Sequence, residues 1–165
     1  MVALAEAVSV SRQTLYNRFE SKEAVLEWAT SQLIKDLRVD ALSCFADAIK
    51  PTADVLLDAF CCWLCPIVRL LHEGRHGEEF LGLTAAKRHY ASADPLTGFT
   101  AEVSRFLLAR NASATQTVDD DLAFLLVMAA KGLMLTSSSE ESFRSGMAQA
   151  IRGAGIAAQA HFHKK

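Results

Sequence analysis

Apolar side chains recur every three or four residues over most of this 165-residue chain, and this spacing constrains the fold more than any other feature. The longest run extends from Lys22 to Ile49, where the apolar positions follow the period of an α-helix and leave charged residues on the other face. No segment alternates in the manner of a β-strand. The sequence therefore predicts an all-α fold, with further helices at 52–65, 78–91, 95–110, 118–136 and 140–160.

Composition excludes several classes of protein. Hydrophobic residues make up 51% of the chain, which excludes a disordered chain. A net charge of −2 does not indicate a nucleic-acid protein, although a small DNA-contacting surface remains compatible with it. Without a signal peptide or an uncharged apolar run long enough to span a bilayer, we expect a cytoplasmic protein with no membrane span. The cysteines then fit reduced thiols better than a disulfide framework: Cys44, Cys61, Cys62 and Cys65.

The stretch from Val2 to Lys22 predicts two short helices joined by a tight turn. Ser11 is expected to cap the second helix, because its hydroxyl can accept a hydrogen bond from a free backbone N–H. Leu15 and Phe19 recur at i and i+4 and face inward. Two short helices in this arrangement form a helix-turn-helix unit.

The solvent-facing side of the second short helix carries groups suited to a DNA duplex. Arginine can contact guanine edges or phosphates, the amides can bond an adenine edge, and the threonine methyl can meet a thymine methyl. Tyrosine and lysine are expected to position the helix on phosphates. An amphipathic hairpin with a solvated polar face explains the periodicity equally well. The candidate DNA-binding residues are Ser11, Arg12, Gln13, Thr14, Tyr16, Asn17, Arg18 and Lys22.

The string LAEAVSVSRQTLYNRFESKEAVL closely resembles the operator-binding segment of TetR-family transcriptional regulators. Ser9 stands where that family usually has glycine. Family members also carry a whole helix before this unit, so the DNA-reading domain is expected to be incomplete. The matching residues are Leu4, Ala5, Glu6, Ala7, Val10, Ser11, Thr14, Leu15, Tyr16, Phe19, Ser21, Lys22 and Glu23.

The resemblance implies an incomplete helix-turn-helix domain at 1–28 and a ligand-binding and dimerisation domain at 29–165. The implied function is that of a homodimeric transcriptional repressor. It would bind a palindromic operator in double-stranded DNA and be released by a small, apolar effector, without a cofactor. The alternative is a helical small-molecule-binding dimer that does not bind DNA because its reading domain is truncated.

Bulky side chains on the middle helices lie where members of the resembled family bind their effectors. Taken singly, each is better explained as part of a packed core. The candidate pocket residues are Phe45, Phe60, Trp63, Ile67, Phe80, Tyr90, Phe99 and Phe106.

The last two predicted helices carry features of a helix-packing surface. Small residues recur on one side of the final helix, which allows close approach of another helix. The resemblance implies that these helices pair with their twins in a dimer, and internal packing is the alternative. The candidate interface residues are Leu122, Leu126, Ala129, Leu133, Gly146, Ala150, Gly153 and Ala157.

No catalytic motif was found: the chain has no nucleophile elbow, Gly-rich phosphate loop or HExxH sequence. Cys61 and Cys65 lie one helical turn apart and could form a thiol sensor or soft-metal site, but their apolar neighbours favour buried, inert thiols. His72 and His76 are better explained as part of a solvated turn. Neither enzymatic activity nor a metal site is predicted.

Overall fold

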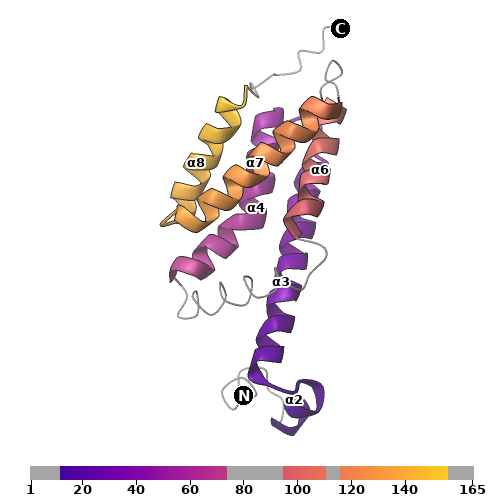
Figure 1. Cartoon of the computed structure of the whole chain (residues 1–165), viewed down its shortest axis with the longest axis vertical. Coiled ribbons are helices and arrows are strands. Elements are labelled where there is room, and N and C mark those ends of the chain that lie inside the picture. The colour runs from indigo at the N-terminus through magenta and orange to yellow at the C-terminus, as the bar shows by residue number, and fades with distance from the viewer. Residues whose placement is uncertain (1–11, 74–94, 111–115, 156–165) are drawn as a thin grey trace. The chain divides into compact units, whose positions relative to one another are not determined.

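The computed structural model describes residues 12–73, 95–110 and 116–155. These residues form α-helices and contain no strand, which confirms the all-α prediction (Figure 1). The helices predicted at 2–8 and 78–91 lie outside the described residues. The described helices are α2 (Arg12–Arg18), α3 (Lys22–Cys44), α4 (Thr52–Glu73), α6 (Pro95–Arg110), α7 (Gln116–Thr136) and α8 (Glu140–Gly153).

The chain divides into two compact units, Met1–Lys35 and Asp36–Lys165, and the division falls within α3. In the first unit, the ring of Phe19 packs against Trp28 with 5.7 Å between centroids. Ser21 caps α3, as its hydroxyl oxygen accepts a hydrogen bond from the Ala24 N–H at 3.1 Å. The predicted boundary at residue 28 also lies within α3.

The turn between α3 and α4 is held by polar contacts. The carboxylate of Asp47 accepts hydrogen bonds from the N–H groups of Lys50 at 3.1 Å and Ile49 at 3.0 Å, which lower its pKa. Arg110, at the end of α6, donates to the carbonyl oxygens of Asp47 and Lys50. These bonds fix the turn, so α3 ends at Cys44 rather than near Ile49 as predicted.

Helix α4 is the central helix of the second unit. The sequence predicts that Pro66 kinks or breaks this helix, and the structure shows that it does not break it. Although Pro66 cannot donate to the carbonyl of Cys62, the buried side chains of Trp63 and Ile67 hold the helix in the core on both sides of it. Figure 1 shows α4 beside α8, with α7 crossing in front. Within the described ranges, α4 alone is long and apolar enough to span a membrane, but half of it is buried by its neighbours, which is compatible with the core helix of a soluble protein.

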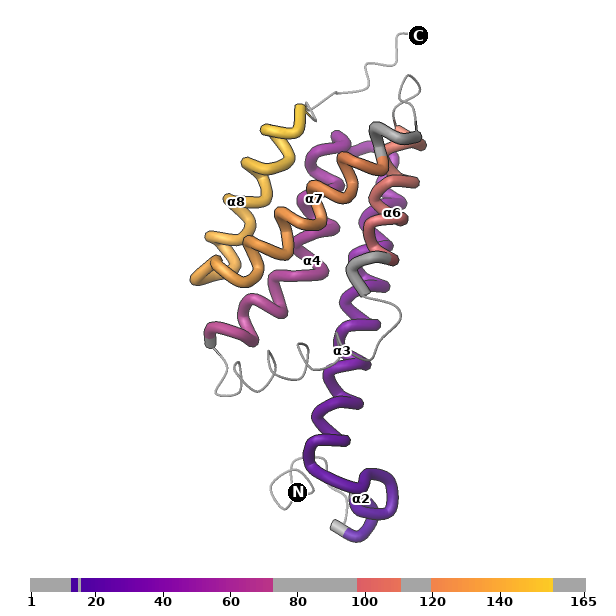
Figure 2. The backbone as a smooth tube through the Cα atoms, viewed as in Figure 1, coloured from indigo at the N-terminus to yellow at the C-terminus, as the bar shows by residue number. Residues whose placement is uncertain are grey.

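Helices α7 and α8 form an antiparallel hairpin (Figure 2). The hydroxyl of Ser139 accepts a hydrogen bond from the Ser142 N–H at 3.1 Å and caps α8. The helices approach closely at Gly146, where an added Cβ would lie 2.6 Å from a methyl group of Leu133, so a larger residue would force that side chain to move. Helix α7 begins slightly before its predicted start. Helix α8 ends at Gly153, before the predicted end near residue 160.

We expect Ser139→Ala to lower the free energy of unfolding by about 1 kcal/mol, because it removes the acceptor that caps α8. Ser138→Ala is the matched control, since Ser138 is exposed in the same turn and does not cap the helix. Urea denaturation of both variants measures the difference. Equal losses would show that the turn, and not the cap, is the source of the stability.

Candidate functional site

The described part of α2 presents a polar surface to solvent. Gln13, Thr14, Tyr16, Asn17 and Arg18 are all exposed. The amide of Gln13 donates to the side-chain oxygen of Asn17 at 3.0 Å, so the two amides lie together on one face of the helix. This pair offers both donors and acceptors to a ligand. Of the other predicted DNA-binding groups, Lys22 is exposed at the start of α3, whereas Ser11 and the side chain of Arg12 lie outside the described part.

The charge of this surface is modest. The pKa of Glu23 is lowered by hydrogen bonds from its own backbone N–H and from the Ser21 hydroxyl, so this carboxylate is charged at neutral pH. Residues 12–23 therefore contain three basic groups and two acidic groups, Glu20 and Glu23, a formal charge of three minus two, or plus one. A nucleic-acid ligand would therefore meet few phosphate-binding groups here, and any sequence specificity would come from the polar side chains.

Five of the eight predicted pocket residues come together in the second unit, where they form an aromatic cluster. The ring of Phe99 contacts Trp63 with 4.1 Å between centroids and Phe60 with 5.6 Å. Phe45, just after α3, stacks on Phe106 at 4.7 Å. Ile67 is buried along the same helix as Phe60 and Trp63, while Phe80 and Tyr90 lie outside the described residues.

One polar atom of this cluster lacks a hydrogen bond within the described ranges. The indole Nε1 of Trp63 is buried and has no hydrogen-bond partner among the residues that the structure describes. A buried donor without an acceptor costs about 1 to 3 kcal/mol. A bound molecule that offers an acceptor to this nitrogen would recover part of that free energy.

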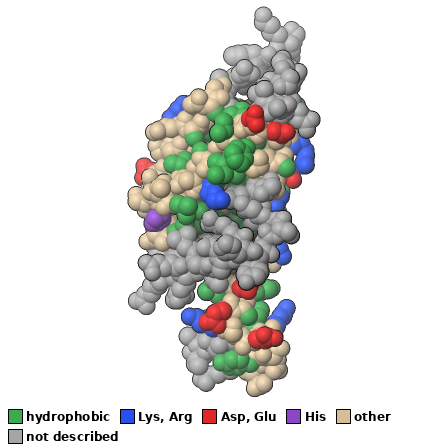
Figure 3. Space-filling model, in the orientation of Figure 1, with side chains coloured by type: hydrophobic (Ala, Val, Ile, Leu, Met, Phe, Trp, Pro, Cys, Tyr) green, Lys and Arg blue, Asp and Glu red, His purple; other side chains and the backbone are tan. Residues whose placement is uncertain are grey.

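Helix α7 carries a stripe of large apolar side chains that face solvent. Phe124, Leu125, Met128 and Leu135 are 56%, 63%, 45% and 44% exposed, and their spacing places them on one side of the helix. Figure 3 shows hydrophobic side chains gathered where α7 faces the viewer. Gly132 lies on the same side with no atom near the position of a Cβ. An apolar surface of this kind is typical of a protein-protein contact.

The structure turns much of the predicted interface stripe on α7 inward. Leu126 is 2% exposed, and Leu133 packs against Gly146 within the same chain, so these two residues belong to internal contacts. The solvent-facing stripe was missed because α7 is apolar on nearly all sides. Of the other predicted interface residues, Gly153 is exposed and Ala157 lies outside the described residues. The remaining four are half-buried: Leu122, Ala129, Gly146 and Ala150.

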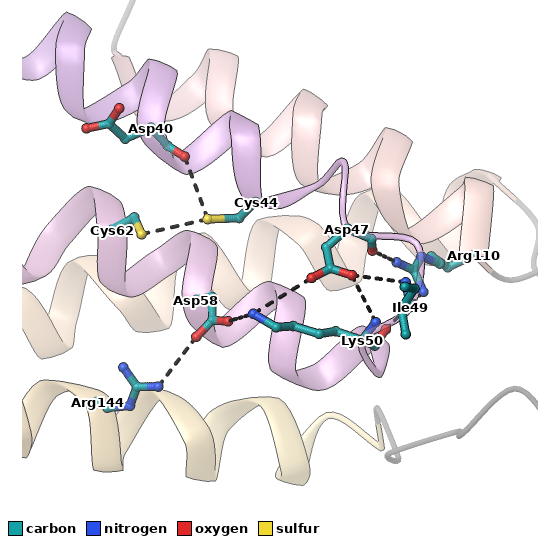
Figure 4. A network of polar contacts seen from close by, with 9 residues as sticks. All are labelled: Asp40, Cys44, Asp47, Ile49, Lys50, Asp58, Cys62, Arg110 and Arg144. Atoms are coloured by element: carbon teal, nitrogen blue, oxygen red, sulfur yellow. Dashed lines mark hydrogen bonds and ion pairs between the residues drawn. The ribbon is translucent and has the colours of Figure 1, made fainter.

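The structure also brings together two cysteines that sequence spacing did not pair. The sulfur of Cys44, at the end of α3, lies 3.7 Å from that of Cys62 on α4 (Figure 4). Burial of Cys44, its hydrogen bond with Cys62 and the charge of Asp58 raise its pKa to about 11. Among the described residues, no cluster of three or more potential ligands could hold a metal ion.

Salt bridges join α8 to α4 next to this thiol pair. Asp58 of α4 contacts Lys50 at 3.0 Å and Arg144 of α8 at 3.4 Å. Arg69 of α4 pairs with Glu140 at the start of α8.

Comparison of the chain with models of known families, with curated proteins and with solved structures finds no match. Function has to be inferred from the residues themselves and from their arrangement.

Proposed function

We propose that this chain is a ligand-responsive transcriptional repressor similar to TetR-family regulators. It acts in the cytoplasm as a homodimer, binds a palindromic operator through α2 and is released by a small effector. The observation that carries the proposal is the exposed polar face of α2, with its Gln13–Asn17 amide pair, directly before the Ser21-capped helix α3. The sequence resemblance falls on this same segment.

Base reading is assigned to Arg12, Gln13, Thr14 and Asn17, and phosphate contact to Tyr16 and Lys22. An amide can form two hydrogen bonds with an adenine edge in the major groove. Because Gln13 and Asn17 already bond each other, one amide can orient the other toward a base. The modest charge of this surface means that a second copy of α2, bound to a second half-site, is needed for tight binding.

The solvent-facing stripe on α7 supports the homodimer. A second copy can cover Phe124, Leu125 and Met128 with the same residues of its own α7, as in any two-fold contact. The dimer must hold two recognition helices at half-sites about 34 to 36 Å apart, or at a multiple of that spacing.

The aromatic cluster is the proposed effector site. Phe45 in this cluster directly follows α3, and α3 contributes residues to both compact units. An effector that separates these rings can displace the end of α3 and so alter the spacing of the two copies of α2. The effector needs only to bind the mis-spaced state better than the DNA-competent state. The ligand class that fits is a small apolar molecule with one hydrogen-bond acceptor for Trp63.

Selection from a pool of random duplexes, followed by sequencing, tests the proposal. The selection uses this chain and a form that carries an additional amino-terminal helix. The resemblance implies that such a helix precedes the helix-turn-helix unit. Recovery of a palindrome by either form supports the regulator. Failure of both forms at low salt would favour the non-DNA-binding dimer instead.

Two substitutions separate base reading from phosphate contact in the form that binds. We expect Arg12→Ala to reduce discrimination between operator and random DNA by about 1 to 3 kcal/mol. Lys22→Ala should weaken binding to all duplexes alike and reduce the slope of log K against log salt by about 1. Titrations at several salt concentrations measure both effects. Equal losses for both variants on operator and random DNA would contradict these roles.

A further inference from the structure

The thiol pair formed by Cys44 at the end of α3 and Cys62 in the middle of α4 has a geometry suited to reversible bond formation. Cys44 and Cys62 are 18 residues apart in sequence, but their sulfur atoms are separated by 3.7 Å (Figure 4). A disulfide has a length of about 2.05 Å, so the sulfur atoms need to approach by about 1.7 Å, which rotation of the two short side chains can provide. Cys62 is exposed and Cys44 is half-buried. The Cys62 thiol is therefore accessible to an oxidant in solution, whereas the Cys44 thiol is less accessible.

We propose that Cys44 and Cys62 are a redox pair, in which hydrogen peroxide oxidises Cys62 and Cys44 then closes a reversible disulfide between α3 and α4. This inference does not depend on DNA binding, because it rests on the two sulfur atoms alone. It assigns a modification site to residues that neither the operator contacts nor the effector cluster uses.

The chemistry proceeds in two steps. The deprotonated sulfur of Cys62 attacks one oxygen of the peroxide, the O–O bond breaks, and hydroxide leaves and takes up a proton to form water, while a sulfenic acid remains on Cys62. The sulfur of Cys44 then attacks the Cys62 sulfur, the S–O bond breaks, and the departing hydroxide takes the Cys44 proton and forms the second water. Together the two thiols lose two protons and two electrons, which reduce the peroxide to two waters.

The surroundings of the two sulfurs assign their order of reaction. Burial, the hydrogen bond with Cys62 and the nearby charges of Cys62 and Asp58 raise the pKa of Cys44, so Cys44 is protonated at neutral pH and is not the first to react. Oxidation of Cys62 removes the thiol that contributes two of these effects. Cys44 can then lose its proton more easily while it lies next to the sulfenic sulfur.

The other two cysteines lie on α4, the helix that carries Cys62. Cys61 is buried on α4 and shares a hydrogen bond with Cys65 one turn further on, and this bond, together with burial, raises the pKa of Cys61. Cys65 lies on the same helix as Cys62, so it is the competing partner for an oxidised Cys62. A Cys62–Cys65 bond would have to form within one continuous helix, whereas the Cys44–Cys62 bond joins the last residue of α3 to the middle of α4.

Peptide mapping of the oxidised full chain tests the proposal. After treatment with hydrogen peroxide and alkylation of free thiols, cleavage before aspartate places Cys44 in fragment 40–46 and the other three cysteines in fragment 58–93. We expect these fragments to be joined through Cys44 and Cys62, to separate on reduction with dithiothreitol, and to remain joined in the Cys65→Ala control. The disulfide should raise the midpoint of thermal unfolding by roughly 5 to 10 °C.

Cys44→Ala and Cys44→Ser remove the second thiol. Because the neighbouring sulfur in the wild type consumes the sulfenic acid, trapping with dimedone should label Cys62 at least about tenfold more in these variants than in the wild type. Equal labelling of wild type and variants would overturn the proposal. A bond confined to fragment 58–93, or one that joins two chains, would do the same, and mapping of the wild type decides this even if a variant fails to fold.

Discussion

Replacing Phe99 with alanine is expected to lower the free energy of unfolding by about 3 to 5 kcal/mol. Phe99 is fully buried and lies at the centre of the aromatic cluster, in ring contact with Phe45, Phe60 and Trp63. Its removal leaves a cavity between α4 and α6 that the surrounding rings can fill only in part. A loss of this size is a large share of the stability of an ordinary domain. Urea or guanidinium denaturation measures it.

Leu108→Ala provides the control on the same helix. Leu108 is 39% exposed, so truncation removes less buried surface and should cost under about 1 kcal/mol. Phe99→Leu keeps most of the volume and should lie between the two. If Phe99→Ala cost no more than Leu108→Ala, the aromatic cluster would be loosely packed rather than a core.

The second large effect is expected at the solvent-facing stripe of α7. Leu125→Glu should raise the dissociation constant of the homodimer by at least about 100-fold, because a two-fold contact would bury two unpaired carboxylates among apolar side chains. Leu125 is 63% exposed in the single chain, so the substitution should leave the fold of the monomer intact. Sedimentation velocity over a range of concentrations measures the dimer, and circular dichroism checks the helices.

Ile49→Glu is the matched control for the dimer. Ile49 is 96% exposed in the turn between α3 and α4 and is not part of the α7 stripe, so its substitution should leave dimerisation unchanged. Leu126→Ala tests the buried side of α7. Because Leu126 is buried, its truncation should lower the free energy of unfolding without weakening dimerisation. A wild-type chain that remains monomeric at high micromolar concentration, or equal dimerisation by Leu125→Glu, would contradict the α7 interface.

Local sequence signals predicted several helix ends well. Ser21 and Ser139 each accept a backbone hydrogen bond at the start of a helix, and α6 begins at Pro95 as expected. These ends depend on one or two residues and their immediate neighbours. Pro66 was misleading, since its local cost is outweighed by the buried side chains on both sides of it in α4.

The candidate sites also differ in how far local sequence predicted them. The exposure of the polar side of α2 follows from its own residues. In the structure these side chains are exposed, as the sequence predicts. The gathering of Phe45, Trp63 and Phe99 into one cluster required packing of separate helices, although their size and apolar character already marked them as core. Whether these sites bind an operator and an effector stays a prediction.

The sequence by itself determined the all-α class, most helix boundaries and the polar face of α2, because spacing and capping act over a few residues. Only the tertiary structure decided which side of α7 faces solvent, since a helix that is apolar on nearly all sides does not specify which neighbours will cover it. The same holds for Cys44 and Cys62: their sulfur atoms lie 3.7 Å apart because the turn after α3 brings its last residue next to α4, and no local pattern encodes that approach. Contacts between distant segments depend on how whole helices pack, and this is fixed by the sum of many side-chain contacts.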